Sequence, residues 1–303
     1  MGNELTVSEN AQYWYQVYGL TVNSEFELPE LPLVDSQDSA DVSIFNGDFQ
    51  QEIDQHSPTN ECLYRVIYDS VGKFLIKNGN KIICDLDSAE ISTQKLFRRF
   101  VEHQLFAIVL LQRGVLLLHG SAVAVNGKGA IFLGPQGAGK STTISAFHQQ
   151  GYQVLADDIV AVQFSEGKPT VVPGVTQPRV NSDTVAALDF EETAVYPDDY
   201  GPKKHYIESD AEVRQVPLET CYILREGENI EIMASRGMDT FFHITRHVHP
   251  LGFLTDTDMT PMDFEQCSML ADKSQIRILK RPKEYDQLLS IVDAVVADMG
   301  IRS

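Results

Sequence analysis

The chain has 303 residues, 43% of them apolar and 22% charged, which is enough to bury one large core or two ordinary ones. Its 43 acidic and 24 basic residues leave a net charge of -19, and such a chain repels polyanions. We therefore expect no nucleic-acid partner.

The N-terminal part predicts a mostly β module. Aromatic and β-branched residues cluster in short runs, and Asn78-Gly-Asn80 is typical of a tight hairpin turn. We find no catalytic group of residues here, so we assign residues 1–90 to an accessory module. We expect this module to orient the molecule on which the rest of the chain acts. Strands are predicted at 13–22, 41–45, 63–68, 73–77 and 81–85.

The pattern changes after residue 90. Apolar residues at helical spacing predict a helix over 92–113, and strands then alternate with helices, which indicates an α/β core spanning 91–303. Residues 194–212 are polar and contain Pro and Gly, so they predict a mobile loop. Strands are predicted at 115–118, 120–125, 129–133, 153–156, 159–164, 170–172, 219–225 and 228–233, and helices at 140–150, 181–188, 239–247 and 282–299.

A phosphate-binding loop follows the apolar run 129–133. The spacing G-x-x-x-x-G-K-S lets main-chain N–H groups surround phosphate oxygens, while the lysine neutralises them and the serine hydroxyl ligates Mg²⁺. ATP and Mg²⁺ are therefore the predicted cofactors. The residues assigned to the nucleotide are Gly134, Gln136, Gly137, Ala138, Gly139, Lys140, Ser141 and Thr142, with Ser141 also on the metal.

Two adjacent carboxylates, Asp157 and Asp158, end the predicted strand after this loop. At the carboxyl edge of a sheet, one acid commonly holds Mg²⁺ and a second accepts a proton from an attacking hydroxyl. We predict Asp157 as a metal ligand and Asp158 as the catalytic base. The alternative is a solvated turn, where Asp is also common.

Phosphoryl transfer also needs cations around the moving group. Arg179 follows a predicted strand and is a catalytic candidate, while Lys203 and Lys204 are candidates for closing over the nucleotide. For each of the three, the alternative is a solvated surface charge. The spacing of His243, His247 and His249 could suit a metal, but no acidic or Cys residue lies near them in the sequence. We therefore favour a helix surface over a metal site.

The run from Leu118 to Thr142, followed by 150–158, resembles the catalytic core of the HPr kinase/phosphorylase family, which is related to phosphoenolpyruvate carboxykinases. That resemblance implies a P-loop kinase fold, a catalytic role for His119, and possible assembly as a homo-oligomer. From the residues alone, the favoured interpretation of His119 is a core histidine hydrogen-bonded to the backbone. Residues 18–32 resemble stand-alone HPr-kinase-like proteins, some linked to ribosomally made peptides.

The chain departs from that family where Thr142 replaces a glutamate, and it has no counterpart of the E-I-R-G-L-G signature. We therefore expect a kinase that phosphorylates a hydroxyl, either a serine of a peptide or protein or a small metabolite. The alternatives are an ATP-binding regulatory or assembly protein without phosphotransfer and a carboxykinase-like enzyme.

The cellular compartment is predicted from features that the sequence lacks. Cys62, Cys84, Cys221 and Cys267 are far apart and favour free thiols in a reducing cytosol. No segment has the ~18 apolar residues of a membrane span, and the first residues lack the basic and apolar regions of a signal peptide. We expect a cytoplasmic protein without a membrane partner.

Overall fold

The computed structural model divides the chain into two compact units. Unit 1 ends at Val115, and unit 2 begins at Leu116 and runs to the C-terminus, apart from a short segment assigned to unit 1. The structure describes residues 13–48, 62–69, 71–88, 90–91, 95–190, 195–197, 204–207, 214–248 and 260–300.

Unit 1 is built on a mixed sheet that has six strands among the described residues, in the order β1-β2-β3-β6-β5-β4. The predicted turn at Asn78-Gly79 is confirmed, because both residues have positive φ and join β5 to β6. The single strand expected over 13–22 is wrong: Tyr18 and Gly19 also have positive φ and fold it into a hairpin. The strands are β1 (Tyr13–Val17), β2 (Leu20–Ser24), β3 (Val42–Asn46), β4 (Leu63–Tyr68), β5 (Gly72–Lys77) and β6 (Lys81–Leu86).

A helical segment packs on one face of this sheet. It consists of α2 (Lys95–Arg99), the π-helical turn η2 (Phe100–Leu105) and α3 (Phe106–Gln112). Aromatic pairs join it to β5 and to the residues that follow β1 and β2, with ring centroids 5.0 to 6.0 Å apart. This packing assigns the segment to unit 1, so the division between units falls after Val115 rather than at residue 90. The pairs are Tyr18–Phe106, Phe26–Phe97 and Phe74–Phe100.

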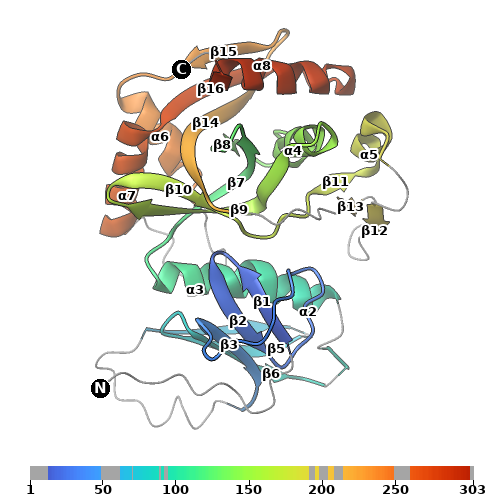
Figure 1. Ribbon diagram of the computed structural model, residues 1–303, viewed down its shortest axis with the longest axis vertical. Helices are drawn as coiled ribbons and strands as arrows, with labels where there is room; N and C mark the ends of the chain where they lie inside the picture. Colours follow the sequence, from blue (N-terminus) through green and yellow to red (C-terminus); the bar gives the residue numbers. More distant parts are fainter. Residues whose placement is uncertain are drawn as a thin grey trace. The chain divides into compact units, whose positions relative to one another are not determined.

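Unit 2 contains a mixed sheet of seven strands in the part of the chain that is described, in the order β10-β9-β7-β8-β14-β16-β15 (Figure 1). Strand β10 also pairs with β14, which closes five of these strands into a ring. A Cβ at Gly129 would lie 2.8 Å from Val171, so only glycine fits where these strands meet. The strands are β7 (Leu116–Val125), β8 (Lys128–Leu133), β9 (Gln153–Ser165), β10 (Lys168–Val172), β14 (Val216–Glu226), β15 (Glu231–Ala234) and β16 (Gln275–Arg281).

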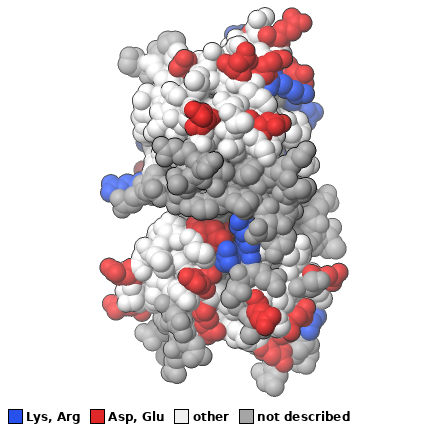
Figure 2. Space-filling view, turned by 90° about the vertical axis from the view of Figure 1, so that its right-hand side faces the viewer, with Lys and Arg blue, Asp and Glu red and all other residues white. Residues whose placement is uncertain are grey.

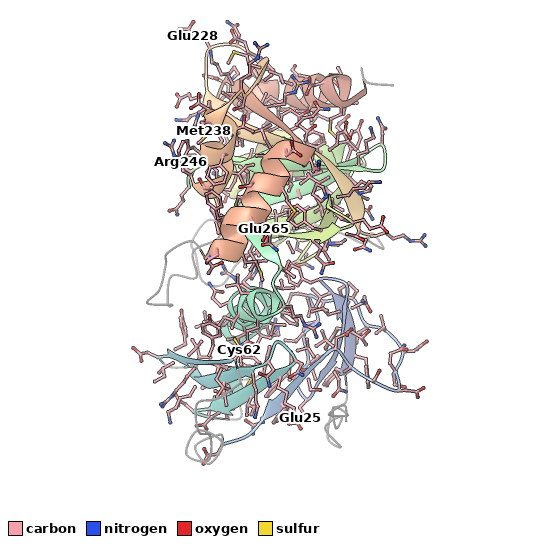
Figure 3. The ribbon with its side chains drawn as sticks, turned by 90° about the vertical axis from the view of Figure 1, so that its left-hand side faces the viewer. Glu25, Cys62, Glu228, Met238, Arg246 and Glu265 are labelled. Atoms are coloured by element: carbon pink, nitrogen blue, oxygen red, sulfur yellow. The ribbon has the colours of Figure 1, made fainter. Side chains whose placement is uncertain are left out.

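Helices cover both faces of this sheet, as expected for an α/β fold. Helices α6 (Met238–Thr245) and α7 (Pro261–Lys273) bury Ile244, Cys267 and Leu270 against one face. Figure 3 shows Met238 and Arg246 at the two ends of α6 and Glu265 on α7. The other face is covered by α4 (Lys140–Gln149) and α8 (Leu288–Gly300), whose buried side chains share a core with Phe132, and α5 (Ser182–Leu188) adds Leu188.

The α/β class is confirmed, but several predicted elements of unit 2 merge or move. The strands expected at 153–156 and 159–164 are one continuous strand, β9, and those expected at 115–118 and 120–125 are β7. The strands expected over 219–233 do not pair with each other, because β16, which we did not predict, lies between them. Helix α7 was also missed, although Thr260 and Asp263 form a capping box at its start.

The polar segment 194–212, expected to be a mobile loop, contains two short strands. These are β12 (Val195–Pro197) and β13 (Lys204–Ile207), and β13 pairs with both β12 and β11 (Arg179–Asn181). Main-chain pairing requires only extended backbone, so the polar composition of the segment did not reveal it. Strand β13 therefore lies directly beside Arg179, one of the candidate site residues.

The surface charge and the state of the cysteines are both as the sequence predicts. Figure 2 shows Asp and Glu side chains spread over the visible face, with Lys and Arg in smaller groups. All four cysteines are free thiols, and only Cys62 is exposed. Within the described part of the chain, no helix is both long and apolar enough to cross a bilayer.

Candidate active site

The register of three neighbouring strands brings the predicted site residues to one level of the sheet. Strand β7 lies between β8 and β9 and is antiparallel to both, so β8 and β9 run in the same direction. Gly120 of β7 pairs with Leu133 on one side and Asp158 on the other. The end of β8, where the phosphate loop begins, is therefore level with the acidic pair, although that pair lies inside β9 rather than at its end.

The loop from Gly134 to Gly139 joins β8 to α4, and its backbone conformation depends on two of its glycines. Gly137 and Gly139 have φ values of 80° and 84°, in the left-handed region that favours glycine. Gly139 is also the N-cap of α4, and it has no side chain to cap the helix. The first N–H groups of α4 are therefore left for a ligand, as at an anion-binding helix N-terminus.

Lys140 is the first residue of α4 and its side chain folds back over the loop. Its Nζ donates to the carbonyl oxygens of Gly134 at 2.9 Å and Pro135 at 3.4 Å, and the residue is only 8% exposed. Burial lowers the pKa of the ammonium, while the charges of Asp158 and Asp157 oppose that shift. A buried cation held in this way is placed to neutralise an anion within the loop.

Asp157 is the buried member of the acidic pair. Its Oδ1 accepts hydrogen bonds from Ser121 Oγ at 2.6 Å and Ser141 Oγ at 3.1 Å, and its Oδ2 accepts one from the Arg179 main-chain N–H at 3.1 Å. Burial raises its pKa, and the hydrogen bonds from Ser121 and Arg179 oppose that rise. Carboxylate and hydroxyl oxygens thus meet at the point where the helix begins.

Asp158 is the exposed member, with 58% of its side chain accessible and a φ of 72°. Its Oδ1 lies 3.3 Å from His119 Nδ1, and His119 Nε2 lies 3.2 Å from Lys140 Nζ. An ammonium can only donate, so His119 Nε2 accepts and the ring proton resides on Nδ1, facing Asp158. One imidazole thereby connects the phosphate-loop lysine to an accessible carboxylate.

The remaining predicted residues are placed in different ways. Arg179 approaches the site through its main-chain N–H on Asp157. The Thr142 hydroxyl, assigned to the nucleotide, instead bonds to the Thr184 hydroxyl at 3.1 Å and so links α4 to α5. Lys203 lies outside the described residues, and the side chain of Lys204 on β13 does as well.

Three contributors were missed from the sequence. Ser121 carries no motif and is revealed only by its pairing level with Asp157. The main-chain oxygen of His247 accepts a hydrogen bond from the main-chain N–H of His119 at 2.7 Å. Burial lowers the pKa of its ring to about 4, and Lys140 and His119 add to this shift. The third is Arg281 at the end of β16, which contacts the loop from the other side.

A pocket of about 210 Å³ adjoins the loop on the side away from Asp158. Strands β8, β14 and β16 are parallel, so their carboxyl ends open toward it, as is usual for ligand sites in such sheets. The site thus extends from Asp158 across the loop to the end of β16. The pocket is lined by Pro135, Gln136, Gly137, Ala138, Leu224, Arg225, Glu226, Arg281 and Lys283.

The residues fit a hard cation bound together with phosphate. The described part of the chain contains no group of three or more His, Cys, Asp or Glu side chains suited to a metal. Ser141 and Asp157 offer two adjacent oxygen donors, and Mg²⁺ typically takes one or two protein ligands, completing its shell with phosphate and water. Loop, lysine and oxygen donors together have the features of a P-loop phosphate site.

Comparisons with known proteins find similarity among solved structures. No protein-family model matches the chain, and no curated protein matches its sequence. Among solved structures it is similar to the HPr(Ser) kinase/phosphatase from Coxiella burnetii, with 15% identity over 61% of this chain and 98% of that chain, at a TM-score of 0.31.

Proposed function

We propose that the chain is an ATP-dependent kinase that transfers the γ-phosphoryl group to a hydroxyl, either of a serine in a peptide or protein or of a small metabolite. The observation that carries the proposal is the row Lys140, His119, Asp158, with contacts of 3.2 and 3.3 Å. It places an accessible carboxylate next to the cation that the loop holds for phosphate. A protein that only binds nucleotide does not need such a carboxylate.

Each side chain then has a distinct task. Lys140 neutralises phosphate oxygens, and the main-chain N–H groups of the loop bind them. Ser141 and Asp157 would hold Mg²⁺, which when bound supplies charge neutralisation for the phosphates. Asp158 accepts the proton of the acceptor hydroxyl as the oxygen attacks phosphorus, and the bond from phosphorus to the ADP oxygen breaks.

His119 is best described as a residue that positions Asp158. Its Nδ1–H faces both the carboxylate, at 3.3 Å, and the main-chain oxygen of Asp158, at 3.2 Å. These contacts hold the side chain of a residue whose backbone is in the left-handed region, where non-glycine residues carry strain. The carboxylate is thereby kept in place before the acceptor arrives.

The pocket beside the loop suggests the direction in which the nucleotide lies. With the γ-phosphate near Asp158 on the β9 side, the nucleoside would occupy the pocket at the ends of β14 and β16. None of the side chains of this site belongs to unit 1, so we propose that unit 1 serves the acceptor instead.

The test is transfer of labelled γ-phosphate from ATP to a library of serine-containing peptides and to small alcohols, with Asp158→Asn beside the wild-type chain. We expect a labelled ester with the wild-type chain and a large loss with the variant, while both bind ATP. ATP binding without transfer to any acceptor would support the alternative of a regulatory ATP-binding protein.

A further inference from the structure

Arg281, the last residue of β16, lies directly against the phosphate loop. Its Nη2 donates to the Ala138 main-chain oxygen at 2.6 Å, and its Nη1 donates to the Pro282 oxygen at 3.0 Å. A Cβ added to Gly139 would fall 1.8 Å from Nη2. The guanidinium therefore occupies the space that a side chain at Gly139 would need.

The hydrogen bond to Ala138 also orients the next N–H group. In a planar trans peptide the C=O and N–H point in opposite directions. Since the Ala138 oxygen faces Arg281, the N–H of Gly139 points away from Arg281. Gly139 ends the loop and caps α4, so its N–H belongs to the set that can surround a phosphate.

We propose that Arg281 is a positioning residue for nucleotide binding: it holds the Ala138 carbonyl outward and so keeps the Gly139 N–H turned into the phosphate cradle. This inference rests on the proposed function of the loop. The orientation of a phosphate-binding N–H group would then depend on a side chain that is distant in sequence and belongs to no nucleotide-binding motif.

The surroundings of Arg281 show that the contact is specific and costly. The residue is 6% exposed, and its Nε is buried with no hydrogen-bond partner in the part of the chain that the structure describes. Burying a charged group without full pairing is unfavourable, so a side chain that serves only to pack would be better replaced by an apolar one. A negatively charged ligand in the adjoining loop compensates that cost.

The experiment compares Arg281→Met, which removes the donors at similar volume, with Arg281→Lys, which keeps the charge and one donor group. Lys280→Met is the matched control, because Lys280 is the neighbouring residue of β16 and only pairs with Glu231 at the surface. Binding of Mg²⁺-ATP and of inorganic tripolyphosphate is measured by calorimetry, and thermal unfolding is followed without ligand.

We expect Arg281→Met to weaken ATP and tripolyphosphate by the same factor, roughly tenfold to a hundredfold, which is the effect of one hydrogen bond to a charged group. Arg281→Lys should recover part of the loss, and Lys280→Met should bind both ligands like the wild-type chain. Equal factors for the two ligands would locate the effect at the phosphates.

Two results would overturn the proposal. Unchanged affinities in Arg281→Met would refute the positioning role and leave the proposed kinase function in place. A lower melting temperature with no recovery of affinity in Arg281→Lys would show that Arg281 only joins β16 to the loop. If the wild-type chain bound neither ligand, the proposed function would fail as well, so the two failures are distinguishable.

Discussion

The two units bury charge in different ways. In unit 1, Glu102 is 2% exposed and lies near the partly buried pair of Arg98 and Glu30, where Arg98 donates to both Glu30 oxygens at 3.0 Å. In unit 2, the buried charges Lys140, Asp157 and Arg281 all surround one loop at the carboxyl ends of parallel strands. A buried charge is costly in either place. Among the residues that the structure describes, only those of unit 2 gather several buried charges around a surface that an anion and a cation can reach.

The largest effect should come from the exposed carboxylate of that site. Asp158→Asn removes the proton acceptor but keeps the shape, so turnover should fall about 10²–10⁴-fold with little change in ATP affinity. Steady-state phosphotransfer and calorimetric ATP binding measure the two effects. Asp183→Asn, an exposed change at the start of α5, is the control. Equal loss of binding and turnover would contradict the role of Asp158.

Removing the buried cation should affect binding instead. Lys140→Ala loses the ammonium that contacts the loop, so ATP should bind roughly tenfold to a hundredfold more weakly. Lys128→Ala is a matched control, because Lys128 begins β8 and pairs with Glu219 at the surface. If Lys140→Ala bound ATP as tightly as the wild-type chain, Lys140 would not be a ligand-binding charge. It would then be a structural buried charge like Glu102, and the difference between the two units would disappear.

Glu102 tests the other side of the comparison. Burial, followed by the charge of Glu30, raises its pKa well above the ordinary value, so the folded state retains a proton that the unfolded state has lost. This group therefore stabilises the fold most at low pH, and the contribution is lost as pH rises above the unfolded value of about 4.5 toward the raised one.

Glu102→Gln should therefore lessen the loss of stability with rising pH, by about 1.4 kcal/mol for each unit by which the pKa is raised. Melting temperatures between pH 5 and pH 9 measure this, with the exposed change Asp38→Asn as control. ATP binding should not change. An equally steep fall of melting temperature with rising pH in Glu102→Gln and in the wild-type chain would contradict the raised pKa of Glu102.

The smallest effect concerns His247, behind His119. Its pKa of about 4 lies below the ordinary 6.5, so the unfolded state takes up a proton that the folded state resists. Its stabilising contribution is complete above pH 6.5 and is lost as pH falls toward 4. His247→Gln should show a smaller drop in melting temperature over this range than the wild-type chain. An identical drop would contradict the assignment.

The phosphate loop could be predicted from sequence because its chemistry is local. Glycine spacing, lysine and serine act within one turn, and the structure gives Gly137 and Gly139 the positive φ values that their type allows. Helix α4 and the Asn78-Gly79 hairpin were predictable for the same reason. The missed strand β16 and the merged strand β9 depended instead on neighbours distant in sequence, which no local pattern reports.

By itself, the sequence determined the composition of the site: a loop that binds phosphate, two adjacent carboxylates and a histidine. Tertiary structure decided which of these meet. The pairing of β7 with β8 and β9 set His119 beside Lys140 and Asp158, and Ser121 beside Asp157. The pairing of β14 with β8 and β16 brought Arg281 to the loop at Ala138. The physical reason is that side-chain chemistry is a property of single residues, whereas strand register is decided by the burial of whole faces of the sheet.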